Sequence, residues 1–125
     1  MLEVYSTNVV VEADAAIPFN NVVIKKGCTA EESAPATIQL NKCGVYMVSV
    51  DASSETAATI QLSKDGVLQP QAQSTGTSPG FVTLVQVPRS NTNCCCSSPT
   101  LLQIVNAGTA TATFTDVNVC VTKVC

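Results

Sequence analysis

The most reactive side chains in this chain of 125 residues are its seven cysteines, three of which are adjacent at Cys94-Cys95-Cys96. Thiolates bind soft metals, so the triplet is a candidate thiol or metal cluster where copies of the chain meet. Two other interpretations stay open. The thiols are small buried hydrophobes at strand ends, or some form disulfides, such as Cys28 with Cys43 or Cys120 with one of the triplet. Because no Cys-x-x-Cys spacing occurs, a zinc ribbon or redox motif has little support, and we expect no resident metal and no cofactor.

Acid–base and nucleophilic chemistry has little support either. The chain has no histidine, the commonest general base, so nothing obvious activates its many serines and threonines. Asp51 and Glu55 flank a Ser-Ser pair, which is poor evidence for the two acids of a glycosidase. The carboxylates considered as calcium ligands are Glu12, Asp14, Glu31 and Glu32. No Asp-x-Asp-x-Asp-Gly loop is present, so these are interpreted as solvated charges, and we expect the protein not to be an enzyme.

The composition excludes several other classes of protein. Six Lys and Arg residues against nine Asp and Glu residues give a formal charge of −3, so no cationic surface for nucleic acid is expected. Hydrophobic residues make up 46% of the chain, which excludes intrinsic disorder. No apolar run approaches the roughly 18 residues of a membrane span, and residues 1–5 lack the cationic start of a signal peptide. We expect folding in a reducing cytosol and no insertion into a membrane.

The apolar residues recur with a period of two, which is the period of β-strands. The strand candidates are residues 37–40, 45–50, 59–62, 81–87, 101–105 and 115–124. Residues 45–50 are apolar in both phases, as expected for a strand covered on both faces. Turn signals separate the candidates, at 43–44, 64–66, 78–80 and 106–108. The best helical candidate is 13–16, which Pro18 ends, so the pattern predicts a single antiparallel sandwich or barrel.

Charged residues are distributed very unevenly. The stretches from Gly66 to Pro88 and from Ser90 to Thr115 contain none, and only Arg89 separates them. A small monomeric β-domain normally carries charge on most of its exposed strands, whereas the cores of protein interfaces are depleted of charge. The distribution therefore favours a homo-oligomer in which these stretches face another copy.

The order of several short motifs resembles a known family. A strand near Ile17-Pro18-Phe19-Asn20 is followed by Gly44-Val45-Tyr46, which opens a central strand. A Leu-x-x-x-Gly hairpin follows at Leu62–Gly66, and a Val-Asn-x-Gly turn at Val105–Gly108 precedes the last strand. From about Ile17 to the end, the chain resembles the complement-q/tumour-necrosis-factor-like jelly roll. The resemblance is strongest to its bacterial and phage branch, which includes phage head-fibre and tail-tip proteins and the tip domains of exosporium glycoproteins.

The resemblance implies an all-β, antiparallel jelly-roll sandwich of about ten strands. It forms a single domain over residues 1–125, in which residues 1–16 are an N-terminal arm or first strand. It also implies a compact homotrimer. The residues expected at the trimer interface are Tyr5, Tyr46, Leu101, Ile104, Val117, Val119 and Val121.

The implied function is that of a non-enzymatic virion protein, assembled in the host cytoplasm, that serves in a phage head fibre, capsid decoration or tail tip. Its expected partners are other copies of itself and either capsid or tail proteins or a host cell-surface ligand. The alternative is a jelly-roll adhesion module that is secreted or lies on a bacterial cell or spore surface, with its cysteines used for cross-linking. No collagen-like Gly-X-Y stem precedes the domain, which makes the tip of an exosporium filament the less favoured role.

Overall fold

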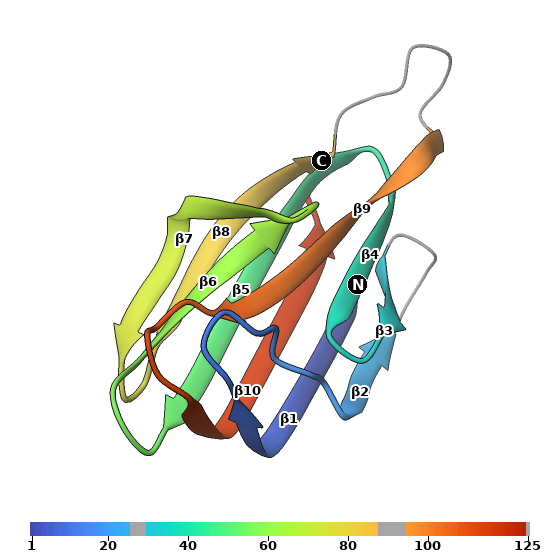
Figure 1. The fold of residues 1–125 in the computed structure, drawn as a ribbon. Helices are drawn as coiled ribbons and strands as arrows, with labels where there is room; N and C mark the ends of the chain where they lie inside the picture. The colour runs from blue at the N-terminus through green and yellow to red at the C-terminus, as the bar shows by residue number, and fades with distance from the viewer. Residues whose placement is uncertain (26–29, 88–94, 125) are drawn as a thin grey trace.

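Ten antiparallel strands build the protein, and a computed structural model describes them over residues 1–25, 30–87 and 95–124 (Figure 1). The strands are β1 (Leu2–Val11), β2 (Asn21–Lys25), β3 (Ala30–Ala34), β4 (Thr37–Lys42), β5 (Gly44–Ser54), β6 (Ala58–Lys64), β7 (Val67–Gly76), β8 (Gly80–Val87), β9 (Cys95–Asn106) and β10 (Ala112–Lys123). Within the described part of the chain there is no helix, and hence none long and apolar enough to cross a membrane.

The strands form two five-stranded sheets that pack face to face (Figure 1). Sheet A has the order β2-β1-β10-β5-β8, and sheet B has the order β3-β4-β9-β6-β7. The chain crosses repeatedly between the sheets, so that the first long strand pairs with the last, with Leu2 opposite Val121 and Val11 opposite Ala112. This is the all-β jelly-roll sandwich that the sequence predicts.

The turns lie where Gly, Asn and Asp punctuate the sequence. Between β6 and β7, Asp65 and Gly66 adopt φ values of 51° and 84°. Two successive residues with positive φ match the right-handed twist of the flanking strands, which is why Asp-Gly is favoured in two-residue hairpins. The Gly44-Val45-Tyr46 motif opens β5, as the resemblance implies.

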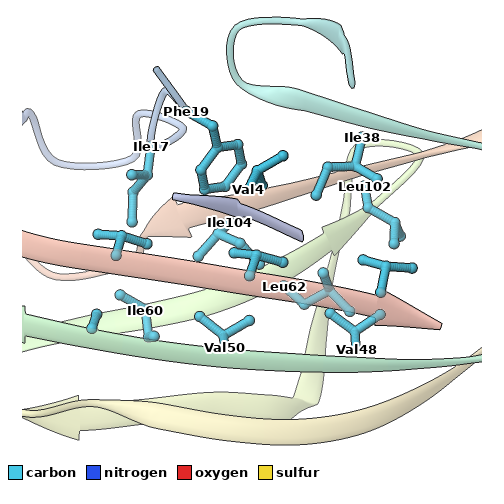
Figure 2. Close-up of a cluster of buried hydrophobic side chains, with 14 of the residues drawn as sticks. Val4, Ile17, Phe19, Ile38, Val48, Val50, Ile60, Leu62, Leu102 and Ile104 are labelled. Atoms are coloured by element: carbon cyan, nitrogen blue, oxygen red, sulfur yellow. The ribbon is translucent and has the colours of Figure 1, made fainter. Parts of the chain in front are cut away.

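The core lies between the sheets and is built mainly from alternate residues of the inner strands (Figure 2). Sheet A contributes Val48 and Val50 from β5 and three valines from β10, at 117, 119 and 121. Sheet B contributes Ile60 and Leu62 from β6 and, from β9, Leu102 and Ile104. Because successive side chains of a strand point to opposite faces, the same alternation leaves the other half of each strand outside the core.

The segment 12–20 differs from both sequence predictions for it. No helix forms at 13–16, since Asp14 adopts a left-handed φ of 64°, and no strand forms at 17–20. The segment instead lies along β9, where the backbone N–H of Ile17 donates to the Ile104 carbonyl at 2.8 Å. Ile17 and Phe19 are buried in the core (Figure 2). The Ser6 hydroxyl donates a hydrogen bond to the carbonyl of Pro18. The apolar residues of this segment therefore cover part of the core between the two sheets, without forming a strand of their own.

Candidate functional site

The outward side of sheet A carries a set of uncharged side chains across β8, β5 and β10, with exposed aliphatic groups on β8 and β5. Leu84 lies opposite Met47, which in turn lies opposite Thr122 on β10. In the next row, Val82 lies opposite Ser49, and Ser49 lies opposite Cys120. We call this set, together with Val45, the sheet A face. Val82 and Leu84 are 66% and 62% exposed, which is unusual for aliphatic side chains that follow one another on the same side of a strand.

Charged groups surround the sheet A face but do not enter it. Asp51 and Asp116 lie further toward one end of β5 and β10, and Glu3 lies on the neighbouring β1. The Glu3 carboxylate accepts a hydrogen bond of 3.1 Å from the Asn118 amide, which holds it at this border. An apolar centre with a polar and charged border is the usual arrangement of a protein interface.

The outward side of sheet B is richer in polar groups, and its strands also expose Val67, Leu68 and Leu101. It is lined by hydroxyls and by primary amides, which come from Gln39, Gln61, Gln73 and Gln103. Several of these groups bond across or along the strands. The Gln61 amide donates to the Gln69 carbonyl at 3.1 Å, and the hydroxyls of Thr59 and Thr75 are 2.8 Å apart. Amides and hydroxyls are well solvated, so this side is suited to contact with water.

The residues predicted for the trimer interface do not lie together on one surface. Five of them fill the core with exposures of 1% or less, so their side chains have no free surface for a second copy: Tyr46, Ile104, Val117, Val119 and Val121. A role in the core replaces the interface role for these five. Tyr5 is half-buried on the outward side of sheet A, next to Asn118, whereas Leu101 lies on the outward side of sheet B.

The amino-acid sequence contains a signal for the sheet A face. Residues 45–50 and 81–87 are apolar in both phases of the alternation. The prediction that residues 45–50 form a strand covered on both faces is wrong for this protomer, since Met47 on β5 is exposed. The second phase of each strand supplies Val45, Met47, Val82 and Leu84, which are the residues of the sheet A face.

The cysteines and carboxylates form no centre among the residues that the structure describes, where no three Cys, Asp or Glu side chains gather as metal ligands. Cys120 is a half-buried free thiol within the sheet A face, so its predicted pairing with the triplet is not formed. Cys28 and Cys94 lie outside the described residues, and only the backbone of Cys95 and Cys96 is described, within β9.

The carboxylates considered as calcium ligands or acids occupy separate places. Glu31 forms an ion pair of 3.7 Å with Lys25 and accepts a hydrogen bond from Gln39. Glu32 follows it on β3, and burial raises the pKa of its carboxyl above the usual value. Glu12 and Asp14 lie in the segment after β1, whereas Asp51 lies on the outward side of β5 and Glu55 follows the end of that strand. None of these positions suggests a catalytic pair.

The surface of the described residues includes depressions that could hold a small ligand. One, of about 250 Å³, lies on sheet B and is lined by Thr37, Asp65, Gly66, Leu101 and Gln103. Another, of about 190 Å³, lies at the end of the sandwich between the loop before β6 and the loop before β10. Its lining of Thr, Ala, Asn and Gly offers no acid, base or nucleophile with an activator.

Comparison with solved structures identifies the fold as the tumour-necrosis-factor-like jelly roll. Murine APRIL matches with a TM-score of 0.66 and 11% identity, and the match covers 98% of each chain. The globular domain of zebrafish complement 1qA protein matches with a TM-score of 0.68 and 12% identity, over 95% of this chain and 94% of that one. The vertex protein P5 of phage PRD1 matches with a TM-score of 0.64 and 13% identity, over 99% and 96%.

These matches include residues 1–16, which the sequence motifs did not reach. No model of a known protein family matches the sequence, and no curated protein is detectably similar to it. At identities this low, the structural similarity shows the fold and leaves the function to be argued from the surface.

Proposed function

We propose that this protein is a structural or attachment module of a virion, that it is not an enzyme, and that it assembles as a homotrimer through the sheet A face. The single observation that carries the proposal is the cluster of exposed Val82, Leu84 and Met47 on an otherwise well-formed sheet. Burying an aliphatic side chain fully is worth about 1.5–3 kcal/mol, so covering these partly exposed groups contributes favourably to assembly and offsets part of the cost of association.

The contrast between the two sheets supports a second copy of the same chain as the occupant. The sheet A face is free of charge and exposes apolar side chains, and sheet B presents solvated amides on the other side. Three protomers that meet through sheet A around one axis would leave sheet B outward, in contact with water or with other proteins. The long uncharged stretches of the sequence fit this arrangement, because β8 lies within one of them and lines the sheet A face.

The virion setting rests on the fold. The similarity to the vertex protein of phage PRD1 over nearly the whole chain supports a place in a head fibre, capsid decoration or tail tip. In that setting the partners are other copies of the chain, together with capsid or tail proteins or a ligand on the host surface. The proposed role is one of shape and contact, which agrees with a chain that has no histidine and with depressions that lack a catalytic pair.

Sedimentation velocity of the wild-type protein and two variants tests the proposal. Leu84→Lys places a charge in the sheet A face, and we expect it to convert a trimer into a monomer without loss of the β-sheet circular dichroism signal. Val67→Lys is the matched control, since Val67 is 63% exposed on β7 of sheet B, and it should remain a trimer. A wild-type protein that is monomeric at every concentration, or a Leu84→Lys protein that stays trimeric, contradicts the proposal.

A further inference from the structure

We propose that the depression of about 250 Å³ on sheet B binds a single neutral sugar ring, such as the terminal residue of a surface glycan. This inference deepens the attachment role and rests on it for its biological setting. The depression lies over β9, between the start of β4 and the turn that joins β6 to β7 (Figure 1). It is on the side of the sandwich opposite the sheet A face and therefore stays open when that face is covered.

The acceptor at one end of the depression is fixed by the backbone. Asp65 Oδ1 accepts a hydrogen bond of 2.9 Å from the N–H of Leu101, and the carbonyl of Leu101 accepts the N–H of Asp65 at 2.8 Å. These two bonds hold the carboxylate in place over β9. A carboxylate has about four acceptor sites, so one bond to Leu101 leaves it able to accept from neighbouring hydroxyls of a ligand. Such preorganisation reduces the entropy that a weak ligand loses on binding.

The other end of the depression supplies both donors and acceptors. Gln103 Nε2 donates to the Thr37 hydroxyl at 3.1 Å, which fixes the orientation of both side chains. The amide retains a second N–H and a carbonyl oxygen, and the hydroxyl retains its own proton as a donor. Leu101, which is 40% exposed, provides an apolar contact between the two ends. Neighbouring hydroxyls that both donate and accept, beside an apolar C–H face, are the chemistry of a sugar ring.

Charge and size select the class of ligand. The lining includes one carboxylate and no cation, so it disfavours phosphates, sulfates and acidic sugars. A single carboxylate with no other charged ligand is also a poor calcium site, which requires six to eight oxygens. The volume lies below the roughly 300–1,000 Å³ of pockets that enclose drug-sized ligands, which limits the occupant to about one ring. An open site of this size is expected to bind with a Kd of about 1 mM.

The test is a titration of the ¹⁵N-labelled protein, followed by NMR, with methyl glycosides of glucose, galactose and mannose and with N-acetylglucosamine. We expect at least one of them to shift the backbone signals of residues 37, 65, 66, 101 and 103 in a saturable manner. Asp65→Asn keeps the turn, because asparagine tolerates positive φ and its Oδ1 still accepts from Leu101, but it removes the charged acceptor. Its affinity should fall about tenfold, the effect of losing one hydrogen bond to a charged group.

The controls separate this site from the rest of the surface. Asp51→Asn removes an exposed carboxylate from sheet A, and Gln61→Ala removes an amide of sheet B outside the depression, so both should bind like the wild type. Gln103→Ala should weaken binding. The inference is overturned if no neutral sugar shifts these signals, if Asp65→Asn binds unchanged, or if only an acidic sugar or Ca²⁺ binds. Sedimentation of the same samples distinguishes failure of the sugar site from failure of the proposed function. A protein that is trimeric but binds no sugar refutes the sugar site and leaves the proposed assembly intact.

Discussion

The side-chain amide of Asn106 donates a hydrogen bond of 3.0 Å to the carbonyl of Val11, and so joins the end of β9 to the end of the first strand. The same amide donates to the Ala110 carbonyl at 3.1 Å, and its Oδ1 accepts the N–H of Gly108 at 3.2 Å. A Cβ at position 108 would lie 3.3 Å from that Oδ1, a tight contact that the asparagine side chain would have to shift to relieve. The Val-Asn-x-Gly motif is thus a device that ties the β9–β10 loop to β1.

Asn106→Ala should therefore destabilise the fold. The variant leaves buried carbonyls without their donor, and each buried polar group that loses its partner costs about 1–3 kcal/mol. Urea denaturation followed by circular dichroism measures the change. Asn21→Ala is the control, because Asn21 is exposed on the edge strand β2, and it should change the free energy of unfolding by less than about 0.5 kcal/mol. Equal effects of the two substitutions would show that the Asn106 bonds contribute nothing.

Tyr46→Phe separates a role in the core from a role in assembly. The Tyr46 hydroxyl donates to the Lys42 carbonyl at 2.7 Å, and its side chain is fully buried. Losing this bond should reduce the free energy of unfolding by about 0.5–1.5 kcal/mol and leave the sedimentation coefficient unchanged. If the variant has wild-type stability but fails to assemble, the Tyr46 hydroxyl contributes to the interface between copies and not to the stability of the protomer.

Val119→Lys should prevent folding, whereas Leu84→Lys should not. Val119 has no exposed surface and lies at the centre of β10, between β1 and β5. An unpaired charge buried there costs several kcal/mol, which is comparable with the whole stability of a small domain. Circular dichroism at 25 °C distinguishes the two variants. A folded Val119→Lys protein would mean that β10 does not pack as described.

These two positions show how far the sequence determines the structure. Alternation along 115–124 correctly placed Val117, Val119 and Val121 on one face, and the Lys-Asp-Gly and Val-Asn-x-Gly signals correctly marked turns. Alternation alone does not say whether a face is covered by the same chain or by another copy. In β5 both phases are apolar, and the resemblance implies an interface role for Tyr46, whereas the structure buries Tyr46 and exposes Met47.

The segment 12–20 and the depression could not be predicted for a different reason. Pro18 and the apolar pair Ile17 and Phe19 fit a strand. The N–H of Ile17 instead donates to the Ile104 carbonyl on β9, about ninety residues away in sequence, and the N–H of Phe19 donates to the carbonyl of Pro35, between β3 and β4. Likewise, Asp65 and Gln103 come together only because β6, β7 and β9 are neighbours in sheet B. Contacts between such distant residues depend on the topology, which no local pattern contains.

Glu32 gives the protein a pH dependence of known sign. Burial raises the pKa of this carboxyl, and among the described residues its Oε2 has no hydrogen-bond partner. The folded state therefore holds the Glu32 proton to a higher pH than the unfolded state does. Its contribution to stability is lost as the pH rises from about the ordinary glutamate pKa through the raised one.

Glu32→Gln removes this titration, so it should be more stable than the wild type at pH 7 and equal to it below about pH 4. Thermal unfolding across this range measures the difference. Glu31→Gln is the control, since Glu31 is paired with Lys25 at the surface, and it should give no gain at pH 7. A Glu32→Gln variant that is less stable than the wild type at neutral pH would show that the ionised carboxylate has a partner.

Cys120 reports whether the sheet A face is covered in solution. Its thiol is half-buried in the protomer and lies opposite Ser49, within the surface proposed to join the copies. In a trimer that covers this surface, alkylation of Cys120 should be at least several-fold slower than in the monomeric Leu84→Lys variant, because the reagent must wait for dissociation or local opening. Mass spectrometry of the peptide that contains Cys120, after timed exposure to iodoacetamide, gives both rates.

Val67→Lys should be alkylated at Cys120 at the wild-type rate, because its new charge lies on the other sheet. Equal rates in the wild type and Leu84→Lys would mean that the thiol is as accessible in the assembly as in the free protomer, and the copies would then have to meet through a different surface.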